Sequence, residues 1–403
     1  MTSLPPTVYL LVESHFQCRD YRRFGIEILQ EQGIRVEVWE IFRPFRRHYA
    51  QSYRPPDPSE YPYIRRFERA SDIYREIGRL GPTDVVIAPW GWANAWVAGG
   101  IFRGLASRDV YFGSVVMGTV AAFYRFRLPS VSGLLSAFYR RIPHRVRRTR
   151  SWSFLLLCGG TVLQSYADLA PDAEYIWTHA LDYDQVLASR REGADQRSQH
   201  IVFLDEYVPF HPDYLMHGFA APNSAAEYYP KLTQLFSQLE KQLGLPVVIA
   251  AHPRSDYAVH PDFFGGRRVV RGQTCALVRD AALVLTHCSV ANNFTVAYRK
   301  PVLVLTTKGL RESFYGPYIE STAATLGRPL IDLDKPASET IAIPPVDEEK
   351  YRQYFRSIIK CEGTPQENTW RIFANYINSR AERRIIRRDS GDAVGEPPGQ
   401  ASQ

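Results

Sequence analysis

The feature that most constrains the fold of this chain is a series of short apolar segments that each end in polar residues. Two such segments, 247–251 and 282–285, run into His252-Pro253-Arg254 and into Thr286-His287-Cys288-Ser289, respectively. In parallel α/β sheets, ligands bind in the crevice outside the carboxyl ends of the strands. The pattern therefore predicts a parallel sheet that presents an imidazole, a guanidinium and a hydroxyl to one anionic, nucleotide-like ligand.

Strand-like and helix-like segments alternate along both halves of the chain. In the first half we expect strands at 8–12, 35–41, 84–88, 153–158 and 173–177, and helices at 21–32 and 63–80. In the second half we expect strands at 201–204, 247–251, 282–286 and 302–305, and helices at 225–243, 273–280, 348–360 and 367–379. This alternation predicts an α/β protein with two Rossmann-like, doubly wound domains that face a cleft.

Composition divides the chain further. A polar stretch at 189–199 is the expected linker between an N-terminal acceptor domain, 1–188, and a C-terminal nucleotide-sugar donor domain, 200–345. Helices at 346–379 follow, and the Pro- and Gly-rich composition of the end predicts a disordered tail at 380–403.

Bulk properties indicate a cytoplasmic protein. The 403 residues are 45% hydrophobic and 23% charged, enough for two domains with a core each. No secretory signal is recognisable, and no apolar run approaches the roughly 20 residues that span a bilayer. The five cysteines are scattered without a CxxC pair, so we expect reduced thiols and no metal site.

A basic segment at 124–150 stands out from the modest net charge of +7. Residues 110–167 contain no acid, and apolar residues recur at three- and four-residue steps between the arginines Arg140, Arg141, Arg145, Arg147 and Arg148. The pattern is typical of a basic amphipathic helix on an anionic membrane surface, although Pro143 must kink it. A solvated face is the alternative. No nucleic-acid module is present, so we expect a peripheral position on the inner face of the membrane.

Three groups of polar residues could carry chemistry. Asp205 and Glu206 follow strand 201–204, and one of them could act as general base toward an acceptor hydroxyl, with a solvated turn as the alternative. His252 could donate to a phosphate or protonate a leaving phosphate, or it could cap a loop. Ser289 could bind an anion or cap the next helix, a task that Asn292 could share.

These residues, in this order, resemble the bacterial sialyltransferase and polysialyltransferase families of GT-B fold, and capsule Kdo transferases share much of the pattern. The resemblance implies that Asp205 or Glu206 is the base, that His252 contacts the CMP phosphate, and that Ser289 holds the donor. Such enzymes need no metal and usually invert configuration. Those families carry Gly where this chain has Tyr207. The stretch 288–304 is equally similar to teichoic-acid glycerophosphotransferases, which use a CDP-alcohol.

The acceptor would lie on the N-terminal domain. Glu13 and His15 follow the first strand, and Trp90 and Trp92 follow the third, where they could stack on sugar faces or simply pack in the core. We therefore expect a glycosyltransferase of capsule or lipopolysaccharide synthesis that moves a CMP-activated sialic or nonulosonic acid, or Kdo, onto a cell-surface or lipid-linked glycan. The alternatives are transfer from CDP-glycerol, transfer from a UDP- or GDP-sugar, and a non-catalytic protein that binds a nucleotide sugar.

Overall fold

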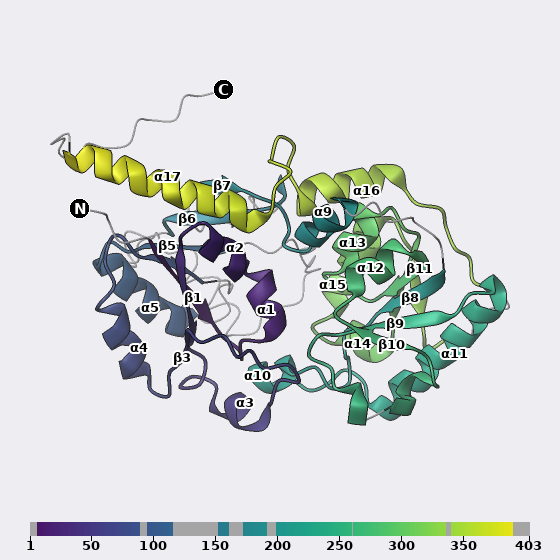
Figure 1. The fold of residues 1–403 in the computed structure, drawn as a ribbon. Helices are drawn as coiled ribbons and strands as arrows, with labels where there is room; N and C mark the ends of the chain where they lie inside the picture. Colours follow the sequence, from purple (N-terminus) through teal and green to yellow (C-terminus); the bar gives the residue numbers. More distant parts are fainter. Residues whose placement is uncertain are drawn as a thin grey trace.

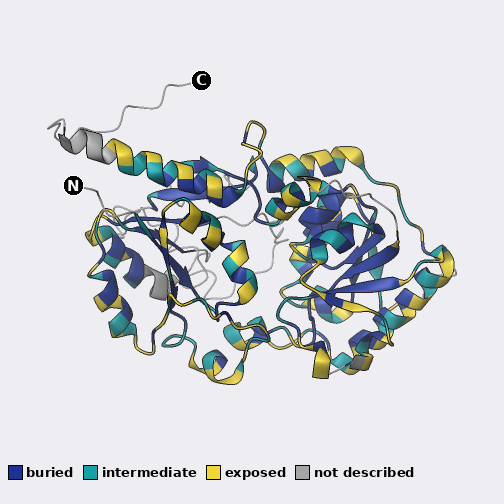
Figure 2. Cartoon of the chain, in the orientation of Figure 1, coloured by how far each residue is buried: buried dark blue, intermediate teal, exposed yellow. Residues whose placement is uncertain are grey.

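The computed structural model describes residues 6–88, 95–115, 152–160, 172–191, 199–259, 261–335 and 340–389. Within them the chain forms two α/β domains, each built around a parallel sheet (Figure 1). The central strands of both sheets are almost entirely buried, whereas β3, β7, β10 and β13 are partly exposed (Figure 2). This burial explains why the central strands read as continuous apolar runs in the sequence instead of alternating patterns.

The N-terminal domain contains a seven-stranded sheet of order β3-β2-β1-β4-β5-β6-β7 among the described residues, with all pairings parallel. Its strands are β1 (Thr7–Val12), β2 (Arg35–Glu40), β3 (Ile64–Arg66), β4 (Val85–Ile87), β5 (Tyr111–Val115), β6 (Phe154–Leu157) and β7 (Glu174–Trp177). Its helices are α1 (Cys18–Arg23), α2 (Ile26–Glu31), α3 (Arg47–Ser52), α4 (Ala70–Ile77) and α5 (Ala95–Ser107).

The C-terminal domain contains a six-stranded parallel sheet of order β10-β9-β8-β11-β12-β13 within the same described ranges. Its strands are β8 (His200–Leu204), β9 (Val247–Ala251), β10 (Val269–Arg271), β11 (Ala281–Thr286), β12 (Val302–Thr306) and β13 (Leu330–Asp332). Its α-helices are α10 (Asp213–His217), α11 (Ala225–Leu243), α12 (Thr274–Arg279), α13 (Asn292–Ala297), α14 (Lys308–Glu312), α15 (Gly316–Leu326) and α16 (Glu348–Tyr354). Short 3-10 turns, η2 (Tyr257–Val259) and η3 (Pro261–Phe264), and a π-helical turn, η4 (Phe355–Ile359), complete it.

Two helices expected in the N-terminal domain are wrong in detail. The helix expected at 21–32 is broken into α1 and α2 because Gly25 adopts a left-handed φ of 52°, which ends a helical run. In place of one helix at 63–80, Ile64–Arg66 pairs with β2 as an edge strand and α4 follows. The apolar residues of this segment fit a helical period of 3.6, and a strand of three residues is too short to show the alternation that would identify it.

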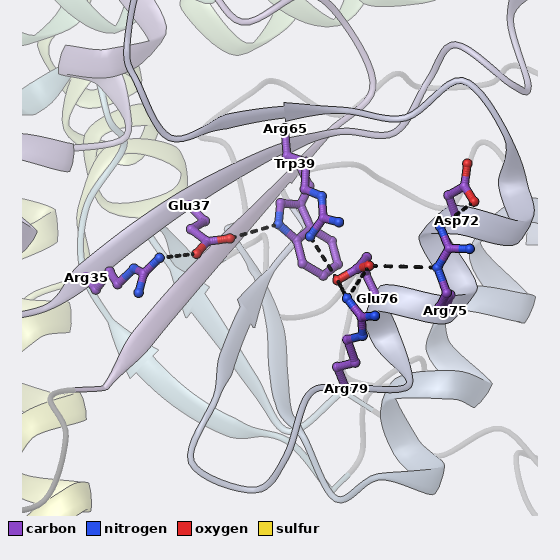
Figure 3. Close-up of polar contacts among 8 residues, drawn as sticks. All are labelled: Arg35, Glu37, Trp39, Arg65, Asp72, Arg75, Glu76 and Arg79. Carbon is purple, nitrogen blue, oxygen red and sulfur yellow. Dashed lines mark hydrogen bonds and ion pairs between the residues drawn. The ribbon is translucent and has the colours of Figure 1, made fainter.

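A polar network fastens this edge strand to the helix that follows it (Figure 3). Glu76 of α4 accepts hydrogen bonds from Arg65 at 2.8 Å and from Arg79 at 2.9 Å. On the neighbouring strand, Glu37 accepts from Arg35 at 2.8 Å. The network supplies contacts that β3 cannot obtain from packing, because two of its three side chains are exposed.

The helix α9 (Tyr183–Arg191) and the segments around it join the domains. A hydrophobic cluster continues from the first sheet through Tyr183 and Val186 to Phe294 and Tyr354 of the C-terminal domain. The Tyr354 hydroxyl also donates to Asn293 Oδ1 at 3.1 Å. Because α9 runs to Arg191, the start of the linker expected at 189–199 is helical.

The last helix, α17 (Thr369–Asp389), returns to the N-terminal domain and lies along it in yellow in Figure 1. Trp370 is fully buried in the core of that domain, and its indole nitrogen donates to the Arg23 carbonyl at 2.8 Å. The tail expected from residue 380 therefore begins too early, because α17 remains helical to Asp389.

We expect Gly25→Ala to weaken the packing of α17 on the N-terminal domain and so to lower the stability of the protein. A Cβ at Gly25 would lie 2.3 Å from the Trp370 ring, whereas a Cβ at Gly33, which also has a positive φ, would meet nothing within 4 Å. Both substitutions carry backbone strain, but only the first adds overpacking, with a cost of about 1–3 kcal/mol. Urea denaturation of the two variants measures the difference; equal midpoints would contradict the packing of Trp370 on Gly25.

Several expectations lie outside the described residues. They are Trp90, Trp92, the basic segment 124–150 with Arg140, Arg141, Arg145, Arg147 and Arg148, residues 192–198, and the tail beyond Asp389. Within the described part of the chain, no helix combines the length and the apolar character that crossing a bilayer requires.

Candidate functional site

The loops after β8, β9 and β11 lie next to one another because these three strands are neighbours in the sheet. Short helix α10, which follows β8, packs against α3 of the N-terminal domain. The Arg46 guanidinium donates to the Met216 carbonyl of α10 and also pairs with Glu13 at 3.4 Å. The residues that follow β8, β9 and β11 thus lie where the two domains meet.

Asp205 is buried and fastens the loop after β9. Its Oδ2 accepts from the His252 backbone N–H at 3.1 Å and from the Tyr257 hydroxyl at 2.9 Å, and its Oδ1 accepts from the Tyr207 N–H at 2.9 Å. Burial raises the pKa of Asp205 to about 6, against the lowering effect of these donors. With its oxygens engaged, Asp205 is arranged to position His252.

Glu206 is directed the other way, toward the loop after β11. Its Oε1 accepts from the Cys288 N–H at 2.7 Å, and its Oε2 contacts only the Cys288 thiol, at 3.4 Å, among the described side chains. Burial raises the pKa of Glu206 to about 7. A carboxyl group whose pKa lies close to neutral pH can exchange a proton there.

Tyr207 adopts a left-handed φ of 52°. This region favours glycine, and a bulky residue there costs of order 1–3 kcal/mol. The strain turns the chain so that adjacent carboxylates reach opposite neighbours of β8.

The site contains a second histidine that we did not single out from the sequence. His211, after β8, lies with its ring centroid 4.7 Å from that of His252. Both histidines precede a proline, and in both turns the third residue donates its backbone N–H to the imidazole Nδ1 at 3.2 Å: Asp213 to His211, and Arg254 to His252. The repeated His-Pro dipeptide was the signal in the sequence that could have found His211.

The two turns are joined by an ion pair. Arg254 Nη1 donates to Asp213 Oδ1 at 2.7 Å, so the third residues of the two turns hold the turns together. Pro253 and its counterpart Pro212 stiffen the loops between the histidines and this pair.

Both imidazoles are neutral donors. Burial, with smaller effects from His211 and Arg254, lowers the pKa of His252 well below its usual range, and burial lowers the pKa of His211 to about 4. Because Nδ1 of each ring accepts a hydrogen bond, the proton of each neutral ring is on Nε2. The turns therefore place two N–H donors beside the Arg254 guanidinium, a combination suited to phosphate oxygens.

The residues after β11 divide into two kinds. His287 is fully buried, with Nε2 bonded to the Tyr228 hydroxyl at 2.6 Å and Nδ1 to the Leu305 carbonyl at 2.8 Å. Both ring nitrogens of His287 are thus used inside the core, and its expected role in binding the donor stays a prediction. Ser289 is half-buried, and its hydroxyl accepts from the Ala291 N–H at 3.3 Å; Ala291, not Ser289, precedes α13.

Asn292 opens α13 and is buried, yet neither atom of its amide forms a hydrogen bond with the described residues. The hydroxyl of Thr286 is also buried without such a bond. Buried polar groups are normally bonded to protein or water, so these two side chains near Ser289 retain unused hydrogen-bonding capacity.

On the N-terminal domain, Glu13 and His15 follow β1 as expected. Glu13 is engaged by Arg46, which bridges to α10. His15 is buried against Phe42 and lies near Tyr49 and Tyr53, with ring centroids 5.9 and 6.1 Å away. Burial lowers the pKa of His15 to about 4, so it is neutral. Within the described ranges, no group of three or more His, Cys, Asp or Glu side chains could hold a metal ion.

Comparisons with known proteins place the fold. No family model matches the chain, and no curated protein matches it. Among solved structures, it is similar to the wall teichoic acid polymerase TagF, with 10% identity over 95% of this chain and 91% of TagF and a TM-score of 0.52. The chain has the two-domain GT-B fold.

Two weaker similarities accompany TagF. They are to MurG of Acinetobacter baumannii (10% identity, 93% of this chain and 99% of that chain, TM-score 0.46) and to the UDP-GlcNAc 2-epimerase of Methanocaldococcus jannaschii (9% identity, 94% and 99%, TM-score 0.43). At these identities the likeness concerns the fold, which hosts several reactions.

Proposed function

We propose that this protein is a metal-independent, inverting glycosyltransferase that moves a sugar from a nucleotide-activated donor to an acceptor hydroxyl. The observation that carries the proposal is the pair of His-Pro turns: two neutral imidazole N–H donors beside Arg254, all at the carboxyl ends of adjacent strands. Donors held in place where negative charge develops stabilise a departing phosphate without reorganisation.

The donor's phosphate in this proposal lies between the loops after β9 and β11. His252, His211 and Arg254 contact it from one side, and Ser289, Thr286 and Asn292 from the other. The amide and hydroxyl left without partners after β11 support this placement. Pro253 keeps the first loop rigid.

Of the two candidate bases, Glu206 has the better support. Its pKa of about 7 suits proton abstraction near neutral pH, and its Oε2 accepts a weak hydrogen bond from the Cys288 thiol at 3.4 Å. The acceptor hydroxyl gives its proton to Glu206 while its oxygen bonds to the anomeric carbon. The bond from that carbon to the phosphate oxygen breaks, and its electron pair leaves with the nucleotide. Asp205 acts by positioning His252.

The donor that we favour is a CMP-activated sialic or nonulosonic acid, or Kdo, because the order of the motifs resembles enzymes that use CMP. The acceptor would be a cell-surface or lipid-linked glycan, reached from the inner face of the membrane through the basic segment 124–150. A second candidate is transfer from a CDP-alcohol: TagF, with a TM-score of 0.50 in the complex with CDPG, supports it.

A thermal-shift screen against CMP, CDP, UDP and GDP tests the proposal. Binding to the folded state alone raises Tm by mass action, about 2.7 kcal/mol of stability at 100 times Kd. We expect a cytidine nucleotide to raise Tm and Asn292→Ala to reduce the shift. Asn375→Ala, at an exposed position of α17, is the matched control and should leave the shift unchanged.

Each outcome of the screen has a distinct meaning. Preference for CMP supports the activated acid sugars, preference for CDP supports the CDP-alcohol, and preference for UDP or GDP moves the donor assignment. Binding without transfer, unaffected by Glu206→Gln, would indicate a non-catalytic nucleotide-sugar-binding protein. No shift with any nucleotide would contradict the proposed donor site.

A further inference from the structure

Unpartnered polar groups gather where α1 and α3 of the N-terminal domain meet the His252–Arg254 loop. Four belong to the N-terminal domain and one to the C-terminal domain: His15 Nε2, Arg19 Nε, the hydroxyls of Tyr49 and Tyr53, and Arg254 Nε. All five are buried atoms that form no hydrogen bond with the described residues. Isolated cases occur in proteins, but a group of potential donors in one place requires an explanation.

The geometry brings the tyrosines together as a pair. Tyr49 and Tyr53 are one helical turn apart, with ring centroids 5.3 Å apart and planes at 20°. Tyr49 is 1% exposed, and the His15 backbone is close enough to its hydroxyl to oppose the rise in pKa that burial causes, although the contact does not have the geometry of a full hydrogen bond. Packing alone would favour phenylalanine at both positions, since a phenol that bonds to nothing loses its hydration on burial.

The electrostatic surroundings favour an anion. Burial raises the pKa of Tyr53, while the positive charges of Arg254 and Arg19 oppose the rise. Both guanidinium groups, one from each domain, thus act on the same hydroxyl. Burial lowers the pKa of Arg19 to about 10, and Arg254 adds to the lowering, so the two cations repel each other when nothing lies between them.

The nearby acidic residues do not occupy all the N–H donors of the two guanidinium groups. Asp20 lies 3.4 Å from Arg19 Nε and also accepts from the Gln17 N–H at 3.0 Å. Asp213 accepts from Arg254 Nη1. Arg254 is thus paired through Nη1 and keeps a buried Nε–H that forms no hydrogen bond with the described residues, whereas Arg19 Nε has only the long contact with Asp20.

We propose that Arg19, Tyr49 and Tyr53, with Arg254 across the domain boundary, form a subsite for an oxyanion, a phosphoryl or carboxylate group of the acceptor. The assignment to the acceptor rests on the proposed function, in which the C-terminal domain holds the donor, because three of the four residues belong to the N-terminal domain. The acceptor is accordingly an acidic glycan or a glycan phosphate. The oxyanion would also bridge two cations that otherwise repel each other, and so favour the approach of the domains.

Titration calorimetry with inorganic phosphate and with acetate, at constant ionic strength, tests the subsite. We expect saturable binding of one of the two anions, weakened at least about 10-fold by Arg19→Gln and several-fold by Tyr53→Phe. Arg22→Gln, on the exposed face of α1, and Tyr63→Phe, on an exposed ring, are the matched controls and should bind as wild type does. A preference for phosphate or for acetate identifies the acidic group.

The cytidine-nucleotide shift, measured in the same variants, separates this inference from the proposed function. An unchanged nucleotide shift with weakened anion binding supports the acceptor subsite. Loss of the nucleotide shift in Arg19→Gln would overturn the assignment, because the subsite would then serve the donor. Absence of saturable anion binding, or equal binding in all variants, would overturn the subsite even if nucleotides bind. Weakened anion binding without any nucleotide shift would support the oxyanion site and overturn its assignment to an acceptor.

Discussion

Replacing His252 by alanine should lower kcat/KM for the nucleotide-activated donor by about 10²–10³-fold, the usual cost of removing one hydrogen-bond donor from a site where charge develops. The variant loses the Nε2–H that contacts the phosphate in the proposed mechanism, and it loses the Nδ1 that accepts a hydrogen bond from the Arg254 backbone. Nucleotide release from the donor, followed with and without acceptor, measures the effect. His211→Ala should show a loss of the same order, because the two turns are joined through Asp213 and Arg254.

The double variant distinguishes a joint site from two separate ones. Residues that act on one group are not additive, so His211→Ala with His252→Ala should cost little more than either change alone. His48→Ala, at an exposed position of α3, should retain wild-type activity. Full additivity of the two losses, or activity in His252→Ala equal to that of wild type, would return the histidines to structural roles.

The pH profile of the same reaction follows from three groups. The lowered pKa values of His252 and His211 keep both imidazoles neutral in the neutral pH range, so no inflection near the ordinary histidine value of about 6.5 should arise from them. Burial raises the pKa of Glu206 to about 7, so kcat/KM should rise with pH through about 7 and level off once the base is ionised. Glu206→Gln should remove this inflection together with most of the activity.

Much of the fold was predictable because buried parallel strands are continuous apolar runs. The strands at β1, β2, β8, β9 and β11 were found within a residue or two of their bounds. The short edge strands β3, β10 and β13, of three residues each, were not expected. They are held by pairing and by polar networks such as that of Glu76, which leave no local apolar period.

The site was predictable in its location but not in its contacts. Residues after adjacent parallel strands must lie at one edge of the sheet, which is why Asp205, His252 and Ser289 were identified. Whether a side chain in these loops faces the surface or the core depends on the local backbone conformation, which the residue types do not reveal. His287 and Ser289 are two residues apart, yet the first bonds inside the core and the second is partly exposed. The pairing of His211 with His252 joins loops that are distant along the chain.

Asp205→Ala should be strongly destabilising, by about 3–5 kcal/mol, because an unsatisfied buried donor costs about 1–3 kcal/mol and three would be left. The His252 N–H, the Tyr207 N–H and the Tyr257 hydroxyl would all lose their acceptor inside the protein. The urea midpoint measures this cost, and Asp256→Ala, on an exposed neighbour, is the control. A wild-type midpoint in Asp205→Ala would mean that the carboxylate does not hold the β9 loop.

The pH dependence of the stability of the milder Asp205→Asn variant tests the same carboxyl group. The pKa of Asp205 is raised on folding, so its effect on stability changes with pH in the opposite direction from that of an aspartate whose pKa is lowered on folding. Burial raises the pKa of Asp205 from 3.8 to about 6 in the folded protein, so the folded state binds the proton more tightly than the unfolded state does. Its contribution to stability is then complete below about pH 4 and is lost as pH rises through about 6. The amide of the variant cannot titrate, so its stability deficit should shrink between about pH 4.5 and 7.5, by up to roughly 3 kcal/mol. A deficit that grows with pH would mean that the three donors outweigh burial and hold the carboxylate as an anion.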